Sequence, residues 1–117
     1  MSKISELTKK ITHEMDNMPE FIQYKETLEA INGDAVLKNK ISQYKQMSVA
    51  YAKKKANGET ANFDEEKAIG ALYAEIMLTE QSSRLFDLER FLFGCLNEIY
   101  ACADTAEFSK MQYAINN

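Results

Sequence analysis

The sequence predicts an all-α protein, and three observations support that prediction. One proline and four glycines in 117 residues leave few positions that would interrupt a helix. Apolar residues recur three and four positions apart along the chain, as they do on one face of a helix. The stretch 85–103 is apolar over an arc of about 220°, wider than the usual stripe of about 100°. We therefore expect a helical bundle of four to five helices, ending in a long helical hairpin or kinked helix, that is oligomeric.

Single residues mark the helix boundaries in the first third of the chain. Ser2 or Ser5 can cap the first helix. Pro19 fits the first turn of the second helix, and Asn17 can cap it. Gly33 can take the left-handed conformation that closes the second helix.

Similar signals follow in the rest of the chain. Asp34 and Asn62 can cap the third and fourth helices, and Gly58 can end the third. The phase of the apolar pattern changes over 79–82, so we expect a kink or short break there; one continuous helix over 64–103 is the alternative. In a single domain over 1–117, the expected helices are 2–16, 19–32, 35–56, 63–78 and 80–103, with 105–117 as a tail that either frays or adds a short helix.

The last of these long helices holds the candidate interaction surface. Its apolar arc is too wide for one neighbouring helix to cover, which is typical of a buried or associating helix. We predict that its large apolar residues form a self-association or partner interface: Leu85, Phe86, Leu88, Phe91, Leu92, Phe93, Leu96, Ile99 and Tyr100.

Charge is divided unevenly along the chain. The net charge is −4, yet residues 1–58 carry ten Lys against seven acidic residues, and residues 59–117 carry four basic against eleven acidic residues. Such a charge asymmetry is at least as consistent with contacts between subunits as with binding of nucleic acid. The candidate basic patch, Lys53, Lys54 and Lys55, is best explained as charge that favours the negative end of a helix dipole, with phosphate binding as the alternative.

No motif in the sequence points to catalysis, a metal or a cofactor. His13 is the sole histidine and has no Glu-x-x-His partner, as a di-iron bundle would require. Cys95 and Cys102 are too few for a zinc site and lie about 10 Å apart on one helix, too far for a disulfide within it. We expect no enzyme, no metal and no cofactor, and packed thiols at both cysteines.

The sequence also indicates a location. No segment approaches the roughly 18 apolar residues of a membrane span, and MSKISELTKK lacks the apolar core of a signal peptide. We expect a cytoplasmic protein without a membrane partner.

An ordered set of residues resembles the YlbF/YmcA family of competence regulators, small all-helical bacterial proteins found mainly in Firmicutes. The resemblance covers about residues 3–104 and consists of hydrophobic and capping positions. The matching residues are Phe21, Tyr24, Lys25, Asn32, Asp34, Tyr44, Gln46, Gly58, Glu59, Leu85, Phe86, Leu88, Glu89, Leu92, Leu96 and Ile99.

The resemblance implies a non-enzymatic adaptor or regulator that forms a dimer or higher homo-oligomer. It implies partners such as a related family member and ribonuclease Y, in mRNA processing that affects competence, sporulation or biofilm formation. Some relatives carry C-terminal cysteines associated with an iron–sulfur cluster, whereas residues 107–117 here contain no cysteine. The alternative function is direct nucleic-acid binding by the basic third helix, through Lys38, Lys40, Lys45, Lys53, Lys54 and Lys55.

Overall fold

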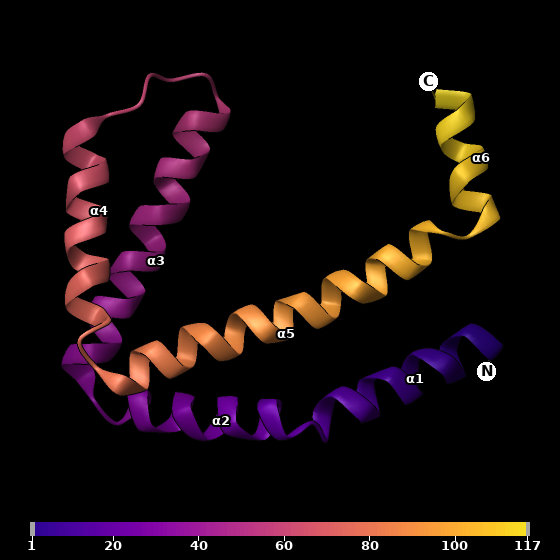
Figure 1. Cartoon of the computed structure of the whole chain (residues 1–117), viewed down its shortest axis with the longest axis horizontal. Helices are drawn as coiled ribbons and strands as arrows, with labels where there is room; N and C mark the ends of the chain where they lie inside the picture. Colours follow the sequence, from indigo (N-terminus) through magenta and orange to yellow (C-terminus); the bar gives the residue numbers. More distant parts are fainter. Residues whose placement is uncertain (1, 117) are drawn as a thin grey trace. The chain divides into compact units, whose positions relative to one another are not determined.

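The computed structural model describes residues 2–116, with side chains for residues 2–112. The described chain consists of helices joined by short connections, and the predicted all-α class is confirmed (Figure 1). Because the tail also forms a helix, the described residues hold six helices rather than four or five. They are α1 (Lys3–Asp16), α2 (Pro19–Asn32), α3 (Ala35–Ala56), α4 (Phe63–Ile76), α5 (Glu80–Asp104) and α6 (Glu107–Asn116).

Polar side chains cap three of the helices as expected. The side chains of Ser2, Asp34 and Asn62 each accept a hydrogen bond from the backbone N–H three residues later, at 3.1 Å. Each bond satisfies one of the backbone donors that a helix N-terminus leaves unpaired.

Two expected caps are wrong. Asn17 does not cap α2; it ends α1, where its amide Nδ2 donates to the carbonyl of His13 at 2.7 Å. Gly33 is not left-handed, and its N–H donates to the carbonyl of Glu29 at 3.1 Å in a helical pattern. Among the described residues only Gly58 has a positive φ, 84°, where it closes α3.

The segment 23–86, here called the hairpin unit, is one of two compact units. Within it α3 and α4 pack against each other along their length. Its buried core contains Ile31, Leu37, Ile41, Ile76 and Leu85, with Tyr24, Leu28, Tyr44, Leu72 and Phe86 packed around it.

The connection between α4 and α5 lies inside the hairpin unit. Residues 77–79 separate the two helices, so the expected break is present, but it lies slightly before the stretch 79–82 where the apolar pattern changes phase. The N–H of Met77 still bonds the carbonyl of Tyr73 at 2.9 Å, so α4 closes normally before the chain turns. The break lets Ile76 and Leu85 enter one core from two helices.

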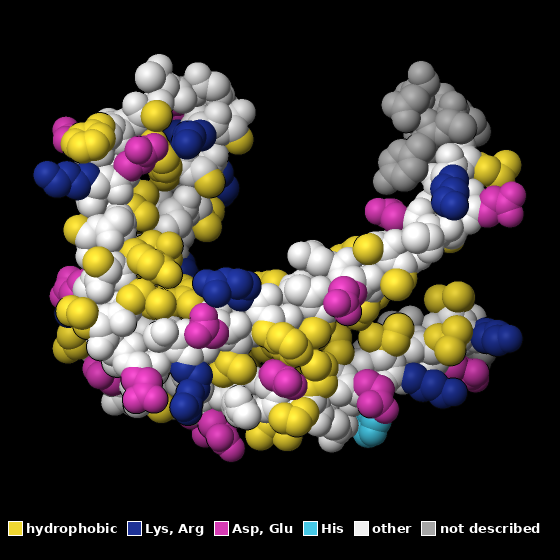
Figure 2. All heavy atoms as spheres, viewed as in Figure 1, with side chains coloured by type: hydrophobic (Ala, Val, Ile, Leu, Met, Phe, Trp, Pro, Cys, Tyr) yellow, Lys and Arg dark blue, Asp and Glu magenta, His cyan; other side chains and the backbone are white. Residues whose placement is uncertain are grey.

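The segments 1–22 and 87–117 form the second compact unit, here called the terminal unit. It contains α1, α6 and the distal part of α5, defined as residues 87–104. No residue of α1 is fully buried. Hydrophobic side chains are visible along the surfaces of α1 and distal α5 (Figure 2). This unit therefore leaves much more of its apolar surface uncovered than the hairpin unit does.

Candidate interaction surface

Distal α5 leaves several large apolar side chains in solvent. Phe91, Phe93, Leu96 and Tyr100 are 45, 61, 38 and 69% exposed. Scattered apolar residues are common on protein surfaces, but Phe93, Leu96 and Tyr100 lie within an arc of about 60° on one helix, whereas Phe91 lies on its opposite side. Distal α5 is the strongest candidate for an interface in the described chain.

Three of these side chains share one face of the helix with two acids. Phe93, Leu96 and Tyr100 follow Glu89 by four, seven and eleven residues, and Asp104 follows it by fifteen. At 100° per residue these five positions lie within an arc of about 80°. We call this set the α5 seam: an apolar centre with a carboxylate at each end.

The nine residues predicted for the interface have different environments. Leu85 is 2% exposed and belongs to the core of the hairpin unit, against which Phe86 packs. Leu88 is buried, and Leu92 and Ile99 are half-buried. Leu85 and Leu88 thus have almost no side-chain surface left for a partner. The interface itself stays a prediction, with Phe91, Phe93, Leu96 and Tyr100 as its accessible members.

A second exposed apolar stripe lies on α1 and was not included in the predicted interface. Ile4, Leu7 and Ile11 recur at helical spacing, and each is exposed. The spacing is visible in the sequence, but nothing in it indicates that the stripe stays uncovered. The terminal unit therefore presents apolar surface on both α1 and α5.

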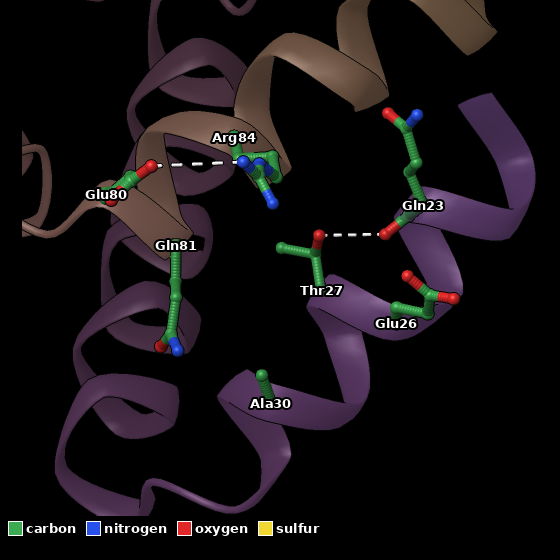
Figure 3. A pocket seen from close by; sticks show the side chains of 7 residues that line it. All are labelled: Gln23, Glu26, Thr27, Ala30, Glu80, Gln81 and Arg84. Atoms are coloured by element: carbon green, nitrogen blue, oxygen red, sulfur yellow. Dashed lines mark hydrogen bonds and ion pairs between the residues drawn. The ribbon is translucent and has the colours of Figure 1, made fainter. Parts of the chain in front are cut away.

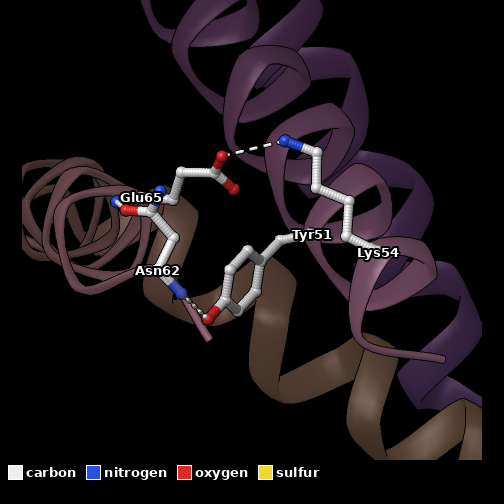
Figure 4. Close-up of polar contacts among 4 residues, drawn as sticks. All are labelled: Tyr51, Lys54, Asn62 and Glu65. Atoms are coloured by element: carbon white, nitrogen blue, oxygen red, sulfur yellow. Dashed lines mark hydrogen bonds and ion pairs between the residues drawn. The ribbon is translucent and has the colours of Figure 1, made fainter. Parts of the chain in front are cut away.

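The lysines at the end of α3 have different environments. Lys54 pairs with Glu65 of α4 at 2.8 Å, a contact that raises the pKa of Lys54 (Figure 4). The ammonium of Lys55 lies 5.6 Å from the centre of the Tyr51 ring. Two members of the triplet thus interact within the hairpin unit, which fits a structural role better than phosphate binding.

Tyr51 adds a second polar link beside that ion pair. Its hydroxyl donates to Glu66 at 2.6 Å and accepts from the backbone N–H of Asn62 at 3.2 Å. The hydrogen bond to Glu66 and, next, burial raise the pKa of Tyr51. These contacts tie the start of α4 to α3, so the polar groups at this end of the unit serve the hairpin.

A family model described as "Control of competence regulator ComK, YlbF/YmcA" matches residues 3–115. The chain belongs to the YlbF/YmcA family. The match confirms the resemblance found in the sequence, and the description of the family is that of a regulatory protein. Neither the curated proteins nor the solved structures contain a significant match to the chain.

The described part of this YlbF/YmcA-family chain holds no group of three or more His, Cys, Asp or Glu that could bind a metal ion. Cys95 is half-buried, Cys102 is exposed, and both are free thiols. Among the described residues, no helix is apolar over enough length to cross a bilayer.

A polar groove of about 260 Å³ lies between α2 and the start of α5 (Figure 3). The Thr27 hydroxyl donates to the Gln23 carbonyl at 2.8 Å, and Arg84 lies 3.8 Å from Glu80. These groups are engaged within their own helices and suit hydrogen bonding rather than group transfer. The groove is lined by Gln23, Glu26, Thr27, Ala30, Glu80, Gln81 and Arg84.

Proposed function

We propose that this YlbF/YmcA-family chain is a non-enzymatic regulatory protein that self-associates through distal α5 and binds other proteins. The observation that supports this proposal is the set of large apolar side chains exposed on distal α5: Phe93, Leu96 and Tyr100 on one face, and Phe91 on the opposite side. Aromatic side chains of this kind are enriched at the centres of protein interfaces, because they bury a large area with few rotatable bonds.

The family gives this surface a biological setting. From the resemblance, we propose that the chain acts as a cytoplasmic adaptor with a related family member and ribonuclease Y. Its effect would be on mRNA processing, and through it on competence, sporulation or biofilm formation. An adaptor needs an accessible surface, which agrees with the exposed apolar side chains on distal α5.

The lysines of α3 favour a protein partner over nucleic acid. Of the six, Lys40 and Lys54 already form ion pairs with acids of α4, at 2.6 and 2.8 Å. Neutralising phosphates requires lysines whose charge is not already matched. The ion pairs therefore reduce the positive charge that the alternative function would use.

The test compares binding of purified ribonuclease Y to the immobilised wild-type chain and to a Phe93→Asp variant. We expect the wild type to bind and the variant to bind at least about tenfold more weakly, since a charge would replace an apolar anchor. Circular dichroism establishes that the variant is folded. A wild-type chain that neither self-associates nor binds the ribonuclease contradicts the proposal.

A further inference from the structure

Helix α1 carries an apolar stripe that the terminal unit leaves largely in solvent. Ile4, Leu7 and Ile11 are 73, 46 and 43% exposed, and no residue of α1 is fully buried. At 100° per residue these three positions lie within an arc of about 60°. We call them the α1 stripe.

The apolar centre of the α5 seam repeats the spacing of the α1 stripe. The α1 stripe advances by three and then four residues, and so do Phe93, Leu96 and Tyr100. With this spacing two helices can pack their side chains as knobs into holes. Each set covers about 10 Å at 1.5 Å per residue, so the two match in length. Leu7 and Leu96 are the middle positions, and they meet whether the two helices run parallel or antiparallel.

The chain's own contacts use a different face of distal α5. Leu92, Cys95 and Ile99 are half-buried, and they lie about 100° around the helix from the centre of the α5 seam. Phe93 and Tyr100 stay 61 and 69% exposed. Since α1 and distal α5 belong to one compact unit and both apolar sets are still exposed, α1 of the same copy does not cover the seam. The covering surface therefore comes from outside the chain.

We propose that the α1 stripe of one copy packs on the apolar centre of the α5 seam of a second copy. This inference rests on the proposed self-association and names the surface that meets distal α5. The six side chains leave about 500–650 Å² uncovered on each copy, if a large apolar residue offers about 150–200 Å². A stable interface buries about 800 Å² per partner, so the two apolar sets of each copy can supply most of that area.

Charge favours α1 over a second α5 as the neighbour of the seam. Residues 87–104 carry four acids and one arginine, whereas Lys3–Asp16 carries three lysines and three acids. Two distal α5 segments packed on each other would bring like charges together, which costs free energy. Helix α1 has equal numbers of both signs and meets no such net repulsion.

A membrane surface is the other occupant that an exposed amphipathic helix could meet. Helices that lie on membranes are rich in Lys and Arg on the polar face and carry Trp, Phe or Leu on the apolar face. Helix α1 has no excess of lysine over acids and no aromatic residue. Its composition therefore fits a second copy better than a membrane.

The first test measures dimer dissociation constants of full-length variants by sedimentation equilibrium. We expect Leu7→Ala and Leu96→Ala each to dimerise at least about tenfold more weakly than wild type, because each removes the middle of one apolar set. Alanine favours a helix at least as well as leucine, and circular dichroism checks that the helix content is kept. The matched control is Leu78→Ala, since Leu78 is 87% exposed between α4 and α5; it should change the constant by less than about threefold.

The second test identifies the pairing by a cross-link in a background with Cys95→Ala and Cys102→Ala. One preparation carries Leu7→Cys, and a second, distinguished by an affinity tag, carries Leu96→Cys. Oxidation of the equimolar mixture with diamide should give a covalent dimer that contains both chains. Replacing Leu7→Cys by His13→Cys, on the opposite side of α1, should lower the yield of that mixed dimer at least about tenfold.

The outcomes separate this inference from the proposed function. A dimer that is weakened by Leu96→Ala but not by Leu7→Ala, or a mixed cross-link no stronger than the His13→Cys control, overturns the pairing and leaves self-association through α5 intact. A wild-type monomer at all concentrations overturns both. If Leu7→Ala spares the dimer but abolishes binding to phosphatidylglycerol vesicles, the α1 stripe is a membrane surface and the pairing is wrong.

Discussion

Replacing Phe93 by alanine should weaken self-association about a hundredfold while leaving the monomer folded. Phe93 lies at the centre of distal α5 and is 61% exposed. A phenylalanine offers about 200 Å² of surface. The chain itself covers about 80 Å² of it, and about 120 Å² stays available to a partner.

These areas give the size of the change in folding stability and of the change in self-association. At about 25 cal/mol per Å², the covered part is worth about 2 kcal/mol of folding stability, and the better helix propensity of alanine offsets about 0.5 kcal/mol of the loss. The exposed part is worth up to about 3 kcal/mol once a second copy covers it. That free energy corresponds to about a hundredfold in the dissociation constant for each Phe93 that the interface covers.

The assay combines sedimentation equilibrium for the dissociation constant with a urea titration for the free energy of unfolding. Phe63→Ala is the matched control, because Phe63 is 74% exposed at the start of α4 and lies outside distal α5. It should change the dissociation constant by less than about threefold. An unchanged dissociation constant in Phe93→Ala, or equal weakening by Phe63→Ala, would refute the assignment of the interface to α5.

Three further predictions concern the hairpin unit. Leu85→Ala should lower the free energy of unfolding by about 2–5 kcal/mol in urea, because Leu85 is buried in the core; a loss below about 1 kcal/mol would contradict that packing. Ser82→Ala should raise the free energy of unfolding by up to about 1 kcal/mol, because the buried Ser82 Oγ has no hydrogen-bond partner among the described residues. A free energy of unfolding lowered by about 1 kcal/mol would instead show that the hydroxyl has a partner. The pKa of Tyr51 is raised above its usual value of 10.0, mainly by the hydrogen bond to Glu66. That hydrogen bond therefore contributes its full stability below pH 10, and the contribution is lost as the pH rises through the pKa of the folded state. The melting temperature of Tyr51→Phe should therefore fall less above pH 10 than that of wild type. If the melting temperatures of the two proteins fall in parallel with pH, the hydrogen bond from Tyr51 to Glu66 does not stabilise the fold.

Local signals in the sequence account for most of the helix boundaries. Asp34 and Asn62 cap helices because their short side chains reach the backbone N–H three residues on, and this depends on neighbouring residues alone. The same reasoning failed at Asn17, which bonds backward to His13 rather than forward into α2. A residue between two helices can serve either one, and local chemistry does not choose between them.

The candidate site could be predicted only in part. Periodicity placed Leu85 and Phe93 on a helix with excess apolar surface, but it does not say which neighbour covers which side chain. Leu85 is buried in one cluster with Ile31, Leu37 and Ile41, which are far away in sequence, whereas Phe93 is mostly exposed. The lysines of α3 are visible in the sequence, but the pairing of Lys40 and Lys54 with acids of α4 is not.

The central claim is that distal α5 is covered by a second copy, and the solution mass by light scattering at several concentrations tests it most directly. The chain mass is 13.4 kDa. We predict a mass of twice that value or more, falling toward the monomer value on dilution and in the Phe93→Ala variant. A constant mass of one chain at every concentration would contradict it.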